Sequence, residues 1–123
     1  MVTIAKKGIN KSDWDYSECL AFRDYAKKNG MAMRGHNLVW ASTDNRNPKW
    51  VNEMTNYTAL ENFMIEYVTT TVQTIGDYPF AWDAINEAVS DNHDEIIKES
   101  PWKHIPDFSC KIFKAAKAAG NGT

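Results

Sequence analysis

Apolar residues recur at helical spacing in three stretches of the chain. The clearest stretch is 58–75, where apolar side chains follow the i, i+3, i+4, i+7 pattern over four turns. Its members are Leu60, Phe63, Met64, Tyr67, Val68, Thr71, Val72 and Ile75. Shorter patterns predict helices over 15–29 and 106–120. Gly30 and Gly76 follow two of the three stretches and Gly120 ends the third, as suits helix ends.

The first two predicted helices each begin with a capping-box pattern. In this motif the side-chain oxygen of the first residue accepts a hydrogen bond from the backbone N–H of the third residue after it. The side chain of a Glu at that later position accepts a hydrogen bond from the backbone N–H of the first residue. Asp15 with Glu18 and Thr58 with Glu61 have this spacing. The sequence therefore predicts helix starts at Asp15 and Thr58.

Two runs with period-two alternation follow these helices and predict strands. Residues 31–40 come directly after a glycine, which is typical of a short helix-to-strand connection. Residues 80–87 form the second run, and 1–5 add a weaker pattern. Helices and strands that alternate in this way predict βα units on a parallel sheet, so the expected fold class is α/β.

The alternation also assigns charged side chains to particular strand faces. Arg34 and His36 share one face of the first strand, and Asp83 and Glu87 share one face of the second. Because an unpaired buried charge is costly, Arg34 or His36 is expected to supply a partner for a carboxylate on the neighbouring strand. A functional cleft and a purely structural pair are both consistent with this pattern.

Glu87 is a candidate catalytic carboxylate because of its position. The C-terminal ends of parallel strands are where α/β barrels and open α/β sheets place their chemistry. The alternative is that Glu87 is a solvated loop acid or caps the next segment.

Two further segments outside the strands have their own predictions. The long polar loop at 41–57 is of a kind that is usually functional or disordered. Residues 96–99 are predicted to form a short helical turn.

The composition is that of an ordinary globular chain. Its 123 residues suffice for one domain with a core, and its formal net charge of −2 gives no nucleic-acid footprint. No apolar run approaches the roughly 20 residues that span a bilayer, and no secretory signal is visible. Five tryptophans suit sugar faces as well as cores.

The cysteines and histidines give no sign of a metal site. Cys19 and Cys110 lie in helical patterns and are interpreted as small buried hydrophobes, with a disulfide left open. His36, His93 and His104 lack metal-ligand spacing. We therefore expect no metal and no cofactor.

Two motifs carry a resemblance to a known family. Residues 34–40, Arg-Gly-His-Asn-Leu-Val-Trp, resemble the Arg-Gly-His-Thr-Leu-Val-Trp signature of glycoside hydrolase family 10, the endo-β-1,4-xylanases. Residues 82–88, Trp-Asp-Ala-Ile-Asn-Glu-Ala, resemble that family's Trp-Asp-Val-Val-Asn-Glu-Ala. The order and separation of the motifs also fit, and the resemblance extends over 14–120.

The resemblance implies a fold, an activity and site residues. Residues 1–123 would form a partial catalytic domain, roughly the third and fourth βα units of a (β/α)8 barrel with flanking helices. The family, which is largely secreted, hydrolyses xylan or other β-1,4-glycans with retention. Glu87 resembles its general acid/base, whose pKa an apolar wall such as Trp40 would raise. His36, Trp40 and Asn86 resemble its substrate-binding residues.

The chain also departs from the family pattern. A retaining glycosidase needs a second carboxylate about 5–5.5 Å from the first, and the family's seventh-strand Glu has no counterpart here. The family's substrate motif on the second strand is missing too, and Ala41 replaces the His that usually follows the signature Trp. We therefore expect the isolated chain to be inactive, because the remainder of the barrel is missing from it.

Two other interpretations stay open. In the first, the chain is part of a degenerate barrel that binds carbohydrate without hydrolysing it and keeps only the Trp and Asn contacts to sugars. Ala41, which replaces the family's His, favours this interpretation. The chain could also be an inactive barrel relic without a ligand. A nucleotide-binding protein is not favoured, because the six glycines are isolated from one another and form no phosphate-binding loop.

Overall fold

The computed structural model describes residues 8–92 and 94–120. The predicted strand pattern at 1–5 lies outside the described residues. Two short 3₁₀ turns, η2 and η3, accompany the helices and strands. In chain order the elements are η2 (Lys11–Asp13), α1 (Ser17–Lys28), β1 (Arg34–Trp40), α2 (Lys49–Asn52), α3 (Tyr57–Ile75), β2 (Ala81–Asn86), η3 (Pro101–His104) and α4 (Phe108–Ala119).

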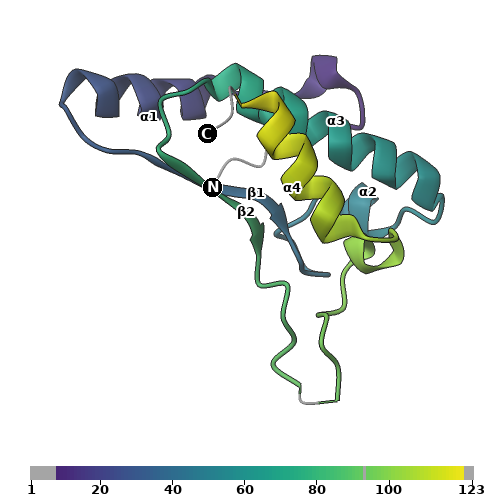
Figure 1. Ribbon diagram of the computed structural model, residues 1–123. Coiled ribbons are helices and arrows are strands. Elements are labelled where there is room, and N and C mark those ends of the chain that lie inside the picture. The colour runs from purple at the N-terminus through teal and green to yellow at the C-terminus, as the bar shows by residue number, and fades with distance from the viewer. Residues whose placement is uncertain (1–7, 93, 121–123) are drawn as a thin grey trace.

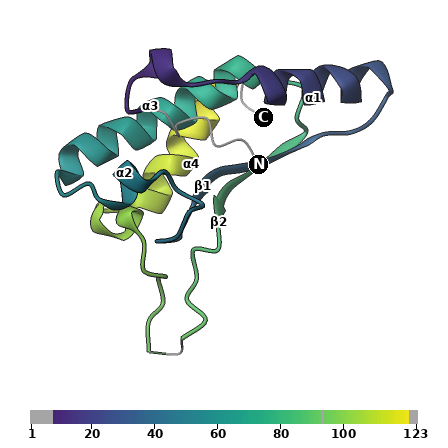
Figure 2. The ribbon, with the colours of Figure 1, turned by 180° about the vertical axis from the view of Figure 1, so that it is seen from behind.

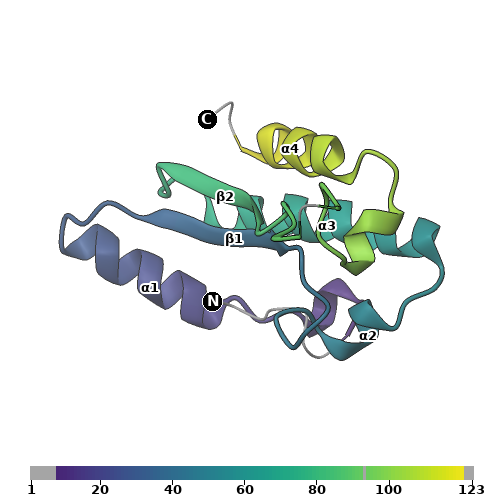
Figure 3. The same cartoon turned by 90° about the horizontal axis from the view of Figure 1, so that it is seen from below.

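Strands β1 and β2 form a parallel two-stranded sheet within the described residues. The register pairs Arg34 with Ala81 at one end and Trp40 with Asn86 at the other. The helices lie over one face of this sheet, with α3 between α1 and α4 (Figures 1 and 2). Seen from the opposite side, the strands lie in front of α3 and no helix covers them (Figure 3). The α/β prediction with parallel strands is therefore confirmed.

Helix α3 supplies more of the buried core than any other element. Seven of the eight residues of its predicted stripe are buried and Tyr67 is half-buried, and Leu60, Met64 and Val68 are completely inaccessible to solvent. Helix α4 contributes Ile112, which is also 0% exposed. Removal of this apolar surface from water is the main stabilising contribution to such a core.

The predicted start of α1 at Asp15 is wrong. The helix begins at Ser17, and Tyr16 occupies the N-cap position without a side-chain cap. The Asp15 carboxylate instead accepts a hydrogen bond from the Ser17 backbone N–H at 2.9 Å, so the box with Glu18 does not form. The Tyr16 hydroxyl lies 3.0 Å from the Thr71 hydroxyl on α3, and this contact fixes the chain just before the helix.

The predicted start of α3 at Thr58 is also wrong. Asn56 is the N-cap residue, and its side-chain oxygen accepts a hydrogen bond from the Ala59 N–H at 3.1 Å. Asn caps a helix at least as well as Thr, so the N-cap lies two residues before the predicted one and the helix begins at Tyr57. The predicted ends are confirmed, since Gly30 and Gly76 follow α1 and α3 with φ of 64° and 76°.

Two other sequence predictions fail. Ile97 forms an antiparallel bridge with Val89, so the predicted helical turn at 96–99 is instead extended chain. Cys110 is exposed rather than buried, because α4 turns Phe108 and Ile112 towards the core instead. Cys19 is partly buried, and both thiols are free.

Gly35 of β1 makes room for the Trp82 ring of β2. A Cβ atom at this position would lie 2.2 Å from the Trp82 ring, so a larger residue would displace the indole. Beyond it, the His36–Asn37 peptide is cis and the strand register shifts between His36 and Val39. Because the register shifts there, Leu38 and Val39 are both buried, and the predicted alternation of faces ends at His36.

Two isoleucines of opposite exposure test this description of the core. Ile112→Ala should lower the free energy of unfolding by about 2–5 kcal/mol, because it opens a cavity between α4 and α3. The matched change Ile96→Ala, at a side chain that is 81% exposed, should alter it by less than about 0.5 kcal/mol. Urea denaturation followed by circular dichroism measures both, and equal losses would contradict the assigned core.

Candidate functional site

Three polar side chains, Arg34, His36 and Asp83, meet on the uncovered face of the sheet. The Asp83 carboxylate on β2 accepts hydrogen bonds from the Arg34 guanidinium on β1, with Nε to Oδ1 at 2.9 Å. Its other oxygen, Oδ2, lies 2.9 Å from the His36 Nδ1. The expected cross-strand pairing is confirmed, and Asp83 contacts both candidate partners rather than one.

This pairing keeps Asp83 ionised. Hydrogen bonds from Arg34 and then His36 lower the pKa of the Asp83 carboxyl from 3.8 to about 2. The same contact raises the pKa of the Arg34 guanidinium. Near neutral pH Asp83 is therefore a fixed acceptor that orients its neighbours, and it is not a proton donor.

Glu87 follows the last residue of β2 and has an unusual backbone conformation. Its φ is 52°, in the left-handed region that residues other than glycine seldom occupy. Such conformations persist where the surrounding structure imposes them, which is frequent at functional sites. The Trp40 indole Nε1 donates a hydrogen bond to the Glu87 Oε2 at 2.9 Å, and the Lys98 Nζ lies 3.3 Å from the same oxygen.

The expectation that Trp40 raises the pKa of Glu87 is wrong for this chain. The pKa of the Glu87 carboxyl is lowered, first by the hydrogen bond from Trp40 and, after a smaller opposing effect of desolvation, by Lys98. The physical reason is orientation, because the indole offers Glu87 its N–H group and not its apolar face. A hydrogen bond to the charged form favours that form.

The other predicted site residues lie next to this pair. The His36 ring packs edge-on against Trp40 with 5.8 Å between ring centroids. Asn86 is paired in register with Trp40, and its backbone carbonyl accepts a hydrogen bond from the Ala41 N–H at 3.0 Å. Trp40, Asn86 and Glu87 therefore lie together at the C-terminal ends of the two strands, with His36 against Trp40.

Sequence reasoning missed two cations at this site. Lys98 reaches Glu87 from 11 residues along the chain, and the guanidinium carbon of Arg46 lies 4.9 Å from the centroid of the Trp40 ring. No spacing rule connects Lys98 with Glu87, because the chain between them leaves the sheet and returns. Arg46 lies in the polar loop after β1, where only the length of the loop hinted at a function.

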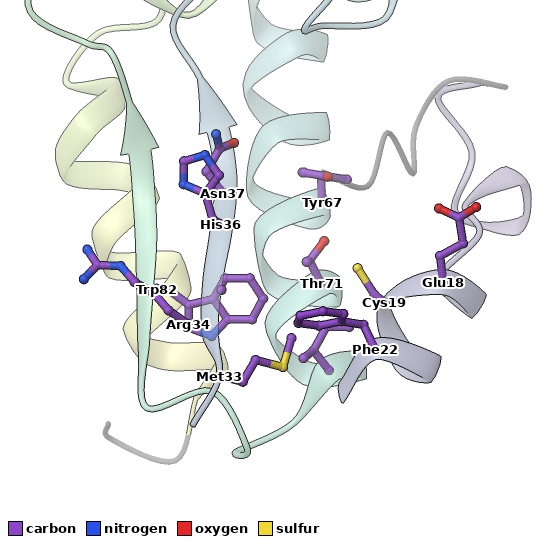
Figure 4. Close-up of a pocket in the computed structure, with 12 residues that line it drawn as sticks. Glu18, Cys19, Phe22, Met33, Arg34, His36, Asn37, Tyr67, Thr71 and Trp82 are labelled. Atoms are coloured by element: carbon purple, nitrogen blue, oxygen red, sulfur yellow. The ribbon is translucent and has the colours of Figure 1, made fainter. Parts of the chain in front are cut away.

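A cavity of about 450 Å³ lies between the sheet and helices α1 and α3, and Arg34 and His36 of β1 are among the residues that line it. Figure 4 shows Trp82 reaching across it towards Thr71 of α3, with Cys19 and Phe22 of α1 on the far wall. Glu87 and Trp40 do not line it. The candidate carboxylate therefore lies on an open surface of the sheet and not inside the cavity.

Neither a metal site nor a membrane-spanning helix is found in the part of the chain that the structure describes. Within 8–92 and 94–120 no group of three or more His, Cys, Asp or Glu side chains could hold a metal ion. None of the helices described there is both long and apolar enough to cross a membrane.

Replacement of Asp83 tests the charge network through its pH dependence. Since the folded pKa is lower than the ordinary value of 3.8, ionised Asp83 stabilises the fold above about pH 4, and this contribution is lost as the pH falls towards about 2. Asp83→Asn should therefore lower the urea midpoint near pH 7. The same change should also make the urea midpoint fall less steeply between about pH 4 and pH 2.

The exposed position Asp91 provides a matched control for this experiment. Asp91→Asn should leave both the urea midpoint near neutral pH and its acid decline nearly unchanged. If Asp83→Asn kept the full acid decline of the unchanged chain, the assigned network would be wrong.

Comparisons with known proteins agree with this geometry. The sequence profile of Glycosyl hydrolase family 10 matches residues 4–122. A β-1,4-xylanase from Dictyoglomus thermophilum is 37% identical over 92 residues, which cover 75% of this chain and 25% of that protein. An endo-1,4-β-xylanase A from Thermotoga neapolitana is 36% identical over 103 residues, which cover 78% of this chain and 10% of that protein.

Solved structures resemble the whole fold. Native xylanase 10B from Thermotoga maritima has a TM-score of 0.85 and 27% identity, covering 100% of this chain and 37% of its own. Xylanase 10B from Thermotoga petrophila RKU-1, in complex with xylobiose, has a TM-score of 0.79 and 29% identity, covering 89% of this chain and 33% of its own. The predicted partial (β/α)8 barrel is thus confirmed, and the chain spans between a tenth and about a third of these relatives. The chain belongs to glycosyl hydrolase family 10.

Proposed function

We propose that this chain is part of an endo-1,4-β-xylanase catalytic domain and supplies its general acid/base, Glu87. The observation that carries the proposal is the position of Glu87 at the C-terminal end of β2, in hydrogen-bond contact with Trp40 of β1. The C-terminal ends of the strands are the catalytic face of a (β/α)8 barrel. Both residues also lie in the two motifs that resemble the family's signatures.

In the proposed reaction Glu87 acts twice. Its carboxylic acid protonates the glycosidic oxygen as the bond to the sugar breaks, and its carboxylate then removes a proton from the attacking water. Within this chain the donors on Glu87 favour the carboxylate form. A second carboxylate about 5–5.5 Å away would raise the pKa of Glu87 by like-charge repulsion and serve as the nucleophile. We propose that the rest of the barrel supplies it.

We propose His36, Trp40 and Asn86 as contacts to the sugar at the cleavage point. Asp83 supports this role for His36, because a hydrogen bond between Nδ1 and Asp83 leaves Nε2 available to a sugar hydroxyl. Trp40 offers a large apolar ring beside Glu87, and such rings suit the apolar faces of sugars. Asn86 offers an amide group directly before the acid.

The surface supports a partial domain over residues 1–123 that further βα units complete. Phe22 on α1, Phe80 before β2 and Phe113 on α4 are each more than half exposed. Large exposed apolar side chains often mark a surface that other elements cover. Because polymeric xylan is too large to enter a cell, action outside the cell is part of the same proposal.

A second candidate is a carbohydrate-binding barrel without hydrolysis. Two observations favour it, namely the alanine at position 41, where the family usually has His, and the lowered pKa of Glu87. Binding without turnover would need the sugar contacts of Trp40 and Asn86 but not a protonated Glu87. The two candidates therefore differ in whether Glu87 affects turnover.

A transplant into a complete barrel tests the proposal. Residues 8–120 would replace the matching segment of xylanase 10B from Thermotoga maritima, and the chimera should hydrolyse xylan. Glu87→Gln should lower kcat/KM on xylan by about 10²–10⁴-fold, because the leaving oxygen loses its proton donor. Cleavage of an aryl xyloside whose leaving group needs no proton should be reduced much less in the glycosylation step.

Matched measurements decide between the two candidates. Glu99→Gln, at a position that pairs with Lys103 and His104 and does not touch Glu87, should leave turnover nearly unchanged. A chimera that binds xylo-oligosaccharides but does not cleave xylan would favour the binding barrel. The isolated 123-residue chain should show no measurable hydrolysis, and turnover that disappears in Glu87→Gln would contradict the need for the missing elements.

A further inference from the structure

The segment after β2 leaves the sheet as an arm and returns to it. This arm comprises residues 88–92 and 94–98, and Figure 1 shows it projecting away from the helices. Val89 and Ile97 form an antiparallel bridge across it, and the Ser90 N–H donates to the Ile96 carbonyl at 3.1 Å. The Lys98 N–H donates to the Ala88 carbonyl at 2.9 Å. The backbone of Lys98 is therefore held beside the residue that follows Glu87.

Lys98 and Trp40 approach the same oxygen of Glu87. The Trp40 Nε1 lies 2.9 Å from Oε2 and the Lys98 Nζ lies 3.3 Å from it. Both donors belong to segments that the backbone fixes, since Trp40 ends β1 and Lys98 is bonded to Ala88. The contact therefore differs from a pair of long, freely rotating surface side chains, for which little energy is expected.

We propose that Lys98 is a positioning residue for Glu87, and that with Trp40 it holds Oε2 so that Oε1 carries the catalytic proton. This inference rests on the proposed function of Glu87 as the general acid/base. A proton on Oε2 would point at two N–H donors, whereas Oε2 without a proton accepts from both. The carboxylic acid is therefore protonated on Oε1.

The proposed step balances at Oε1. In glycosylation the Oε1–H bond breaks, its electron pair stays on Oε1, and the proton forms a new O–H bond to the glycosidic oxygen. The electron pair of the broken C–O bond goes to that oxygen, which leaves as a neutral hydroxyl group while the carboxylate that the rest of the barrel supplies bonds to the anomeric carbon. In deglycosylation the water oxygen bonds to the anomeric carbon and the bond to that carboxylate breaks, leaving its electron pair on the carboxylate. Oε1 takes the proton of the water and returns to the acid form.

The other charged groups near Glu87 act from farther away. Arg46 lies over the Trp40 ring, is paired with Asp44, and adds a weaker attraction that also lowers the pKa of Glu87. The network of Arg34, His36 and Asp83 occupies the same sheet face but is bonded within itself. Among the described residues, the ion pairs of Glu87 are limited to Lys98.

A titration of Glu87 by carboxyl ¹³C NMR in the 123-residue chain tests the proposal. Lys98→Met should raise the pKa of Glu87 above that of the unchanged chain, because the carboxylate loses a cationic donor. Lys98→Arg should restore it most of the way, since Arg also donates to carboxylates. The control Lys103→Met removes a lysine that pairs with Glu95 and Glu99, and it should leave Glu87 unchanged.

A second readout does not depend on how a variant folds. In the unchanged chain the ¹⁵Nζ resonance of Lys98 should move with the same midpoint as Glu87, and the Lys103 resonance should not. An unaltered titration of Glu87 in a natively folded Lys98→Met chain would overturn the proposal, as would a Lys98 resonance insensitive to Glu87. Because neither measurement uses a sugar, failure of the chimera to cleave xylan would contradict the proposed function alone.

The consequence for catalysis can be measured in the chimera. Lys98→Met should shift the basic limb of the kcat/KM profile to higher pH, because the acid form of Glu87 then persists further. A residue with only a structural role would reduce the rate without moving this limb. An unmoved basic limb in a folded, active Lys98→Met chimera would also overturn the proposal.

Discussion

The pairing of Asp83 with Arg34 and His36 is the interaction on which the candidate site depends. It crosses from β2 to β1 on the face that no helix covers, so apolar packing does not hold the strands together there. The bonds of Asp83 join the two parallel strands in one register. This register also determines which residues of β1 and β2 lie side by side at the strand ends. There the register places Trp40 beside Asn86, and Glu87 follows within reach of the indole N–H.

The core and the candidate site use opposite faces of the same two strands. The helix side is packed around α3, and Gly35 makes room there for the Trp82 ring. The other side carries ionised and hydrogen-bonding groups that remain partly exposed in this chain. Glu87 is surrounded by donors and has no neighbouring carboxylate among the described residues, which explains why its pKa is lowered. The chain holds one half of the electrostatic arrangement that a retaining glycosidase needs.

Local patterns in the sequence were sufficient to predict much of the fold. The stripe of α3 and the alternation in the strands depend on residues three, four or two positions apart, so they can be read directly. The partner of Asp83 could be predicted because a carboxylate on a parallel strand has few oppositely charged or hydrogen-bonding candidates on the same face of the neighbouring strand. The helix starts were misplaced by one or two residues because Asn56 competes with Thr58, and because Asp15 bonds Ser17 instead of closing a box.

What could not be predicted depends on contacts between distant residues or on ring orientation. The bridge between Val89 and Ile97 has no signal in the spacing, so the position of Lys98 was hidden. The effect of Trp40 on Glu87 had the wrong sign because a sequence does not say whether an indole presents its face or its N–H. Both errors concern the same carboxylate, where the chemistry is set by orientation rather than by residue type.

The central claim is that the bonds from Asp83 hold the two strands in the pairing that forms the site. A double-mutant cycle on Arg34 and Asp83 tests it most directly, using the free energy of unfolding near neutral pH. Asp83→Asn should lower the free energy of unfolding clearly less in an Arg34→Met background than in the unchanged chain, because the Arg34 partner is already lost. An equal cost in both backgrounds would contradict it.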